Sequence, residues 1–285
     1  MRSFLFVPGD SLRKFESAKK TAADALILDL EDSIAPDEKV GARKTVREML
    51  DARNPGQKAY IRVNALDTGL TLGDLAAVMP GRPDGIVLPK CAGAADVNRL
   101  SLYLDAFEAA AGIEQGTTRI VTVATETARA VLKLLDFENM SPRLWGMMWG
   151  AEDLAASLGA SRNRTGGRYH GPFLLARDLC LISAAAAGVV AIDTIATDIN
   201  DLEALREESI AARQDGFLAK AVIHPKHVDV VNAAFLPTDE EVAWSEKVVK
   251  AFNDNPTSGV VKIDGKMIDK PHLRAAEKIL ALRGR

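Results

Sequence analysis

The segment IVTVATETARAVLKLLDFENMSPRLWGMMWGAEDLAA, residues 120–156, carries the plainest fold signal in the chain. A short apolar run rich in β-branched residues comes first, a helix-like segment follows, and both patterns then recur. Parallel strands need long crossover connections that are usually helices, so this order is typical of a parallel sheet. Glu126 ends the first apolar run and Asp153 follows the second. The segment therefore predicts two β–α units, each with a carboxylate where its strand ends.

The same alternation of short apolar runs and helical segments extends over most of the chain. Eight such units favour an α/β fold of the (β/α)8 type, a TIM barrel. A doubly wound open sheet is the alternative, but a nucleotide-binding sheet would carry a glycine fingerprint, and neither G-x-G-x-x-G nor G-x-x-x-x-G-K occurs. The expected strands are residues 3–7, 25–30, 59–64, 85–90, 120–126, the run that Asp153 follows, 191–197 and 219–225.

A further segment follows the eighth unit and exceeds what a barrel needs. A charged helix is expected over residues 237–252, then a loop as far as Gly265, and a last helix near the end. We therefore predict a barrel catalytic domain in residues 1–236 and a C-terminal helical arm in residues 237–285. The arm is expected to pack on its own subunit or on a neighbouring one.

Composition excludes several classes of function. The 285 residues have a formal net charge of -3, which gives no electrostatic footprint for nucleic acid. No apolar run approaches the roughly 18 residues that a membrane-spanning helix needs. The first residues lack the apolar stretch of a secretory signal, and Cys91 and Cys180 have no metal-ligand spacing. We expect a cytoplasmic protein without nucleic-acid or membrane partners.

Polar residues concentrate where the predicted strands end. Barrel enzymes carry their chemistry at the C-terminal ends of the strands. A single acid at such a position can simply favour the positive end of the next helix. So many polar groups on one rim indicate a functional site instead. The rim residues are Asp29, Glu31, Asp32, Arg62, Asn64, Lys90, Glu126, Asp153 and His224.

Glu126 and Asp153 are the candidate metal ligands. Magnesium prefers oxygen ligands and is usually held by one or two carboxylates, with water and substrate completing its shell. Two acids at the ends of neighbouring parallel strands would face one another above the sheet. His224 precedes a proline at a strand exit, where a structural histidine is favoured over a catalytic one. No G-x-S-x-G elbow occurs, so a serine hydrolase is not favoured.

Arg62 offers a fixed fork of N–H donors for a carboxylate or an oxyanion. Asp29, Glu31 and Asp32 could orient Arg62, hold metal-bound waters or act as bases. Our hypothesis places Asp29 and Glu31 with Arg62 among the catalytic groups, and Lys90 among the substrate-binding groups. A salt-bridge cluster, in which these acids satisfy Arg62 and Lys90, is the structural alternative for at least one of them.

Eight motifs in a fixed order resemble those of a known family. They are RSFLFVPGD, LILDLEDSIAPDEK, IRVNALDTG, VLPK, TETARAV, WGAEDLAASLGA, GFLAKAVIHPKHV and KMIDKPHLRAA. The chain resembles the citrate lyase β-subunit-like group of CoA-ester lyases over residues 2–280. This group lies within the HpcH/HpaI aldolase/citrate lyase family and includes malyl-CoA and citramalyl-CoA lyases.

The resemblance implies a magnesium-dependent TIM barrel that assembles as a homotrimer or a hexamer. The family's metal ligands match Glu126 and Asp153, and its substrate-binding arginine matches Arg62. Phe6 and Arg13 resemble positions that contact CoA.

The resemblance also gives the C-terminal arm a role. Its motif at residues 267–271 contains Asp269, which resembles a catalytic aspartate that a neighbouring subunit presents to the active site. One departure from the family is Ala219, where many relatives have glycine, and the added methyl group affects expectations about substrate rather than fold.

The activity implied by the resemblance is cleavage of a carbon–carbon bond. A β-hydroxyacyl-CoA of the malyl or citramalyl type would be split to acetyl-CoA and a 2-keto acid by retro-Claisen chemistry, with Mg²⁺ as Lewis acid. Three alternatives stay open: a malyl-CoA thioesterase, a CoA-independent pyruvate aldolase, and a citrate lyase β subunit that acts on an acyl-carrier-protein thioester.

Overall fold

The computed structural model describes residues 1–137 and 140–283. The chain forms two compact units, Met1–Asn232 and Ala233–Arg285. Residues 138–139 of the segment quoted above lie outside the described residues.

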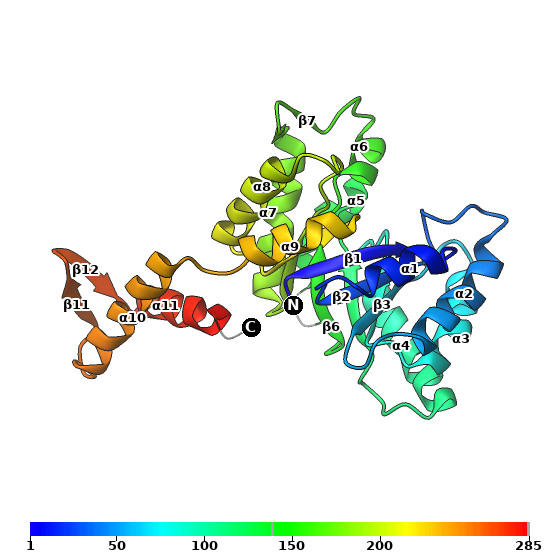
Figure 1. The fold of residues 1–285 in the computed structure, drawn as a ribbon, viewed down its shortest axis with the longest axis horizontal. Helices are drawn as coiled ribbons and strands as arrows, with labels where there is room; N and C mark the ends of the chain where they lie inside the picture. The colour runs from blue at the N-terminus through cyan, green and yellow to red at the C-terminus, as the bar shows by residue number, and fades with distance from the viewer. Residues whose placement is uncertain (138–139, 284–285) are drawn as a thin grey trace. The chain divides into compact units, whose positions relative to one another are not determined.

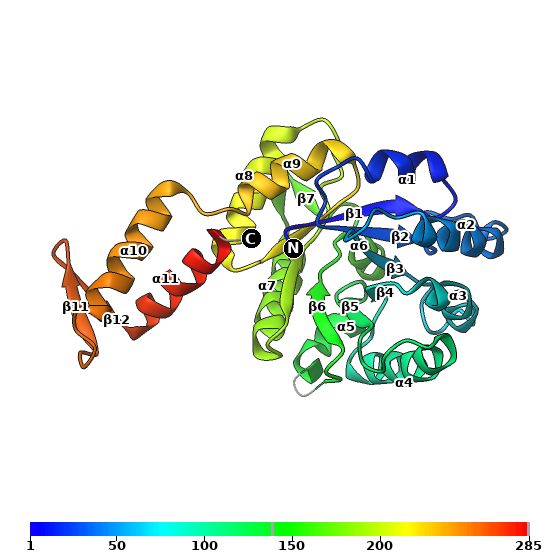
Figure 2. The same cartoon turned by 60° about the horizontal axis from the view of Figure 1, so that its bottom comes forward.

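The first unit is a closed barrel of eight parallel strands in the order β1–β10–β9–β6–β5–β4–β3–β2. The (β/α)8 prediction is therefore confirmed. Helices α2, α3 and α4 lie outside the strands on one side, and α7 and α8 on another (Figures 1 and 2). The barrel strands are β1 (Ser3–Pro8), β2 (Ala25–Asp29), β3 (Lys58–Arg62), β4 (Gly85–Leu88), β5 (Arg119–Val123), β6 (Leu144–Met148), β9 (Val190–Asp193) and β10 (Ala219–Val222).

The helices of this unit alternate with the strands, and a short antiparallel pair, β7 (Arg164–Thr165) and β8 (Arg168–Tyr169), projects after α6. Several strands end earlier than their apolar runs suggest, because the residues that follow leave the sheet while still packing on the core. The helices are α1 (Leu12–Ala18), α2 (Lys39–Asp51), α3 (Thr71–Val78), α4 (Ala94–Ala111), α5 (Ala128–Leu132), α6 (Glu152–Leu158), α7 (Gly171–Ala186), α8 (Leu202–Asp215) and α9 (Pro225–Ala234), with 3-10 turns η1 (Met79–Gly81) and η2 (Leu134–Phe137).

Alternation along the strands fixes which side chains reach the top of the barrel. Phe4, Ile27 and Tyr60 point into the barrel and are fully buried there. Successive side chains of a strand point to opposite faces, so the residue two positions further on points inward again. Two positions beyond Ile27 and Tyr60 come Asp29 and Arg62. The apolar core below therefore directs these charged groups toward the C-terminal mouth.

A buried ion pair joins the helix layer to the start of β6. Arg143 donates to Glu108 of α4 at 2.8 and 2.5 Å. The backbone N–H groups of Gly116 and Thr118 also donate to this carboxylate, each at 2.8 Å. Burial raises the pKa of Glu108, but the hydrogen bonds from Arg143 and the backbone outweigh it and bring the pKa to about 2.

The second unit has its own small core, made by Val248, Phe252, Val261, Ile268 and Ala276. Its helices are α10 (Asp239–Asn253) and α11 (Lys270–Arg283), and between them β11 (Val260–Ile263) pairs antiparallel with β12 (Lys266–Asp269). The expectation that residues 253–265 form only a loop is wrong.

The missed hairpin has a recognisable turn. Asp264 and Gly265 have φ of 49° and 80°, the left-handed values of a tight hairpin turn. Asp-Gly between two short strand-like segments is a known signal for such a hairpin. Within the described residues, every helix is too short or too polar to cross a lipid bilayer.

We predict that Glu108→Gln lowers the free energy of unfolding by about 3 kcal/mol at pH 7, because it removes one partner of a buried pair. Glu108 has a depressed pKa, so its contribution is present above its ordinary value of 4.5 and is lost as the pH falls toward about 2. Denaturant unfolding of the variant and the wild type between pH 7 and pH 3 measures this difference.

The exposed Glu114 provides a matched control, and Glu114→Gln should leave stability unchanged. The assignment fails if the wild type and Glu108→Gln keep the same difference in stability throughout the pH range.

Candidate active site

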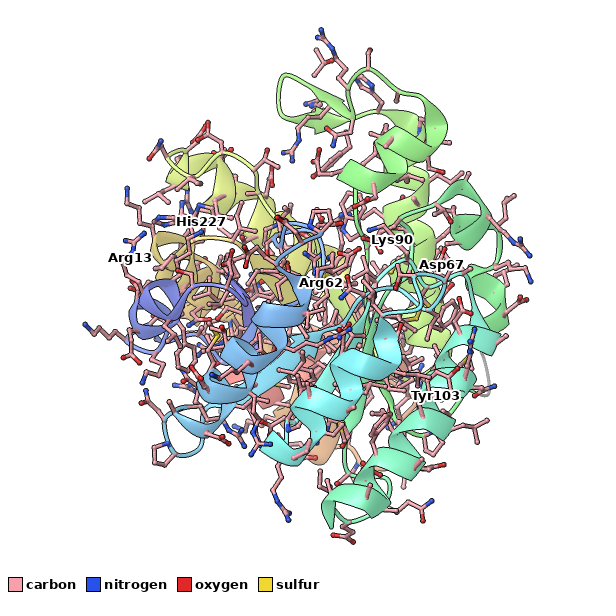
Figure 3. The ribbon with its side chains drawn as sticks, turned by 90° about the vertical axis from the view of Figure 1, so that its right-hand side faces the viewer. Arg13, Arg62, Asp67, Lys90, Tyr103 and His227 are labelled. Atoms are coloured by element: carbon pink, nitrogen blue, oxygen red, sulfur yellow. The ribbon has the colours of Figure 1, made fainter. Side chains whose placement is uncertain are left out.

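The C-terminal mouth of the barrel contains a cavity of about 280 Å³. Residues from β1, β2, β3 and from the exits of β5, β6 and β9 line it. Four of the predicted rim residues therefore converge here from distant parts of the chain, namely Asp29, Arg62, Glu126 and Asp153. Figure 3 shows Arg62 and Lys90 at neighbouring positions, with Arg13 further away on α1. The lining includes Phe6, Asp29, Arg62, Glu126, Asp153 and Thr194.

Arg62 is held by a two-pronged contact with Asp29. Its Nε and Nη2 donate to the two oxygens of the Asp29 carboxylate at 2.7 and 2.6 Å. The same oxygens accept the backbone N–H groups of Glu31 at 2.8 Å and Ser33 at 3.1 Å. Burial would raise the pKa of Asp29, but the bonds from Arg62 outweigh it and lower the pKa. Of the roles predicted for Asp29, this geometry favours orienting Arg62 over acting as a base.

Two further contacts restrain the Arg62 guanidinium. Nη1 lies 3.0 Å from a carboxylate oxygen of Glu31, and the Phe6 ring lies under the group with its centroid 4.9 Å away. A guanidinium has five N–H donors, so it retains donors for a further acceptor after these contacts. Arg62 therefore lies fixed in the cavity wall and can still bind an oxyanion.

Lys90 connects the acids of the rim. Its side chain donates to Glu31, and its Nζ lies 3.3 Å from Asp32 and 3.8 Å from Asp153. Its backbone N–H donates to Glu126. Lys90 has a φ of 50°, a left-handed conformation that is uncommon outside glycine. This turn directs both its N–H and its ammonium toward carboxylates, so the predicted salt-bridge cluster is present around Arg62 and Lys90.

Glu126 and Asp153 differ in their surroundings. Glu126 is 4% exposed, whereas the Asp153 side chain is 39% exposed. Burial raises the pKa of Glu126 to about 8, although the N–H of Lys90 acts in the opposite direction. A buried carboxylate with this pKa is stabilised in its charged form by a bound cation.

The donor set fits magnesium, which two carboxylates, water and a substrate can hold together. No cluster of three or more histidine, cysteine or acidic side chains suited to a metal occurs in the described ranges. A site with two protein carboxylates is consistent with that observation.

A second cavity of about 410 Å³ adjoins the first, and Phe6, Pro8 and Ile223 line both. Arg13 and Lys14 of α1 and His224 line only the second. The two residues predicted to contact CoA, Phe6 and Arg13, therefore both lie along this cavity.

Asp269 lies in the second unit, on β12. Its carboxylate is exposed and lies 2.5 Å from Nδ1 of His272, and this hydrogen bond lowers the pKa of Asp269.

Asn64, another of the predicted rim residues, has a structural role. Its amide donates to Asp74 at 2.8 Å and to the Leu30 carbonyl at 3.0 Å.

Sequence reasoning missed two polar residues that support the rim. Asp74 accepts from Asn64 and from Arg43 and is fully buried. Thr125, directly before Glu126, bonds to the backbone of the neighbouring strand exit at Gly150. The only sequence signal for Thr125 was its place beside a candidate ligand.

We predict that Asp29→Asn lowers the free energy of unfolding by about 3 kcal/mol, because the amide nitrogen cannot accept and leaves the buried Arg62 partly unpaired. Asp51→Asn is the control, since the exposed pair of Asp51 with Arg47 should contribute less than about 1 kcal/mol. Urea unfolding at pH 7 measures both values. Equal losses of stability in the two variants would contradict the role of Asp29 in holding Arg62.

Comparison with known proteins agrees with this architecture. The family model described as HpcH/HpaI aldolase/citrate lyase matches residues 2–225. The chain is 34% identical over 287 residues to (3S)-malyl-CoA thioesterase of Cereibacter sphaeroides strain KD131, which covers 98% of this chain and 93% of that protein. It is 34% identical over 285 residues to citrate lyase subunit beta of Escherichia coli K12, covering 98% of this chain and 92% of that protein.

A similar solved structure is that of CitE from Mycobacterium tuberculosis in complex with magnesium, acetoacetate and coenzyme A. The two structures match with a TM-score of 0.85 and 33% sequence identity, and the match covers 100% of this chain and 98% of that chain. Motif order, barrel topology and these matches over nearly the whole length agree, and the chain belongs to the HpcH/HpaI aldolase/citrate lyase family.

Proposed function

We propose that this protein is a magnesium-dependent carbon–carbon lyase. Its substrate is a β-hydroxyacyl-CoA that carries a second carboxylate, of the citramalyl or malyl type, and its products are acetyl-CoA and a 2-keto acid. The observation that carries the proposal is that Glu126, Asp153 and Arg62, which Asp29 holds in place, all line one cavity. The similar CitE structure with magnesium, acetoacetate and coenzyme A supports the same ligand classes.

Glu126 and Asp153 are the residues that hold magnesium in this proposal. When bound, the ion supplies a Lewis acid and a template for the substrate's hydroxyl and carboxylate oxygens. The buried position of Glu126 supports its assignment, because a cation offsets the cost of its ionised form.

Arg62 stabilises the charge that develops on the thioester oxygen. In the cleavage step the substrate hydroxyl gives its proton to a water molecule, its carbon becomes the carbonyl carbon of the 2-keto acid, and the carbon–carbon bond breaks. The electron pair passes to the acetyl fragment as an enolate, whose oxygen accepts N–H groups of Arg62. Asp29 and Glu31 act on Arg62 by fixing its orientation, which limits the reorganisation needed during the reaction.

Asp269 completes the reaction by protonating the enolate carbon, and in the reverse direction it removes that proton. We propose that a neighbouring subunit of a homotrimer or hexamer presents this residue. Its support is the exposure of the Asp269 carboxylate on the β11–β12 hairpin of a separate compact unit.

CoA occupies the second cavity in this proposal. Arg13 and Lys14 provide positive charge for its phosphates. Phe6, Pro8 and Ile223 line both cavities, so the pantetheine arm of CoA can pass over them and bring the thioester to Arg62.

A thioesterase is the second candidate, favoured by the 34% identity to (3S)-malyl-CoA thioesterases. The same metal and arginine would then assist a water molecule that attacks the thioester carbon. The carbon–sulfur bond would break, and free CoA and a hydroxydicarboxylate would be released.

Product analysis separates these functions. The purified full chain with Mg²⁺ is tested on malyl-CoA and citramalyl-CoA, and we expect equimolar acetyl-CoA and 2-keto acid. Asp153→Asn should lose most of this turnover, because one metal ligand is replaced, whereas the exposed Asp51→Asn should retain it.

Release of free CoA with the intact hydroxy acid would identify a thioesterase. Turnover of an acyl-carrier-protein thioester alone would identify a citrate lyase β subunit, and full Mg²⁺-dependent activity in Asp153→Asn would contradict the metal assignment.

The shared site is tested by mixing inactive Arg62→Ala and inactive Asp269→Asn subunits. Random assembly should restore roughly a quarter of the sites, each with Arg62 from one subunit and Asp269 from its neighbour. Activity is measured after the subunits have been dissociated and reassembled, with each variant treated alone as control. Absence of recovery in oligomers confirmed to be mixed would exclude a site shared in this way.

A further inference from the structure

The exits of β5 and β6 carry the two proposed metal ligands, and a side chain joins these exits. Backbone pairing of the strands reaches Val123 and Met148, and the N–H of Ala124 then donates to the Met148 carbonyl at 2.8 Å. Beyond this point the hydroxyl of Thr125 makes the next hydrogen bonds between the two strand exits. It accepts the N–H of Gly150 at 2.9 Å and donates to the Gly150 carbonyl at 3.2 Å.

This hydroxyl contact lies close in sequence to both carboxylates. Thr125 directly precedes Glu126, and Gly150 stands three residues before Asp153. Thr125 is fully buried, so water does not compete for its hydroxyl. The position of one strand exit relative to the other is therefore linked to a single buried side chain.

Gly150 allows the two exits to approach closely. A Cβ atom at this position would lie 3.2 Å from Cγ of Glu126 and 3.3 Å from a methyl carbon of Val123. These contacts are tight, so an added methyl group would push against the side chain of Glu126. The separation of the two exits is thus limited by sterics as well as by hydrogen bonds.

The residue before Gly150 is anchored separately. The indole N–H of Trp149 donates to Asp193 at 2.6 Å, and Lys220 donates to the same carboxylate at 2.6 Å. All three side chains are buried. Loss of the Thr125 hydroxyl should therefore leave β6 in place and change only the local path of the residues that lead to Asp153.

We propose that Thr125 is a positioning residue of the metal site, which sets the distance between the Glu126 and Asp153 carboxylates through Gly150. The inference rests on the proposed function, because it concerns the same two ligands. Residues that support metal ligands without touching the metal typically change affinity by about 10- to 100-fold when they are replaced.

The test measures Mn²⁺ binding to the full chain by electron paramagnetic resonance, without substrate. Thr125→Val keeps the side-chain shape and removes the hydroxyl, so its affinity should fall at least about tenfold. Thr125→Ser restores the hydroxyl and should bind within about twofold of the wild type.

Thr122→Val, on the strand that leads to Thr125, is the matched control, since the buried Thr122 hydroxyl has no hydrogen-bond partner among the described residues. Its Mn²⁺ affinity should equal that of the wild type. Circular dichroism tests whether each variant is folded.

Wild-type affinity in folded Thr125→Val, with Mn²⁺ binding lost in Asp153→Asn, overturns this inference and leaves the proposed function intact. Absence of Mn²⁺ binding in the wild type, or undiminished binding in Asp153→Asn, overturns both. If Thr125→Val does not fold, Gly150→Ala decides: its added methyl group should also weaken Mn²⁺ binding at least about tenfold, and unchanged affinity overturns the inference.

Discussion

Closure of the sheet is the constraint on which the site depends. Strand β1 pairs in parallel with β2 through Phe4 and Ala25, and with β10 through Ser3 and Lys220. This double pairing turns eight strands into a ring whose carboxyl ends all face one mouth. Once the ring is closed, the alternation of side chains directs Asp29 and Arg62 into that mouth above an apolar core.

Charge balance at the mouth explains why a cation suits it. Arg62 and Lys90 lie among a larger number of acids, and the bidentate contact of Asp29 already satisfies much of the Arg62 guanidinium. Buried carboxylates without a cation are costly, as the raised pKa of Glu126 indicates. A divalent ion would offset this excess of negative charge, and the N–H groups of Arg62 that Asp29 leaves free would be available to a substrate oxygen.

Hydrophobic periodicity predicted the barrel and the rim because both follow from patterns within single segments. The contacts between segments could not be derived in the same way. The left-handed turn of Lys90 and the bond from Thr125 to Gly150 depend on which residues of different segments lie opposite one another, and the periodicity of a single segment does not show this. The β11–β12 hairpin was missed although its Asp264–Gly265 turn is visible in the sequence, since a charged, short hairpin lacks a long apolar run.

Anomalous scattering from Mn²⁺ in crystals of the full chain would locate the metal site at the barrel mouth. Manganese has ligand preferences close to those of magnesium and can be located by its anomalous signal. We expect one peak at the mouth of the barrel, about 2 Å from a carboxylate oxygen of Glu126 and from one of Asp153. An ordered Mn²⁺ elsewhere, or no peak between these residues at saturating Mn²⁺, would contradict this expectation.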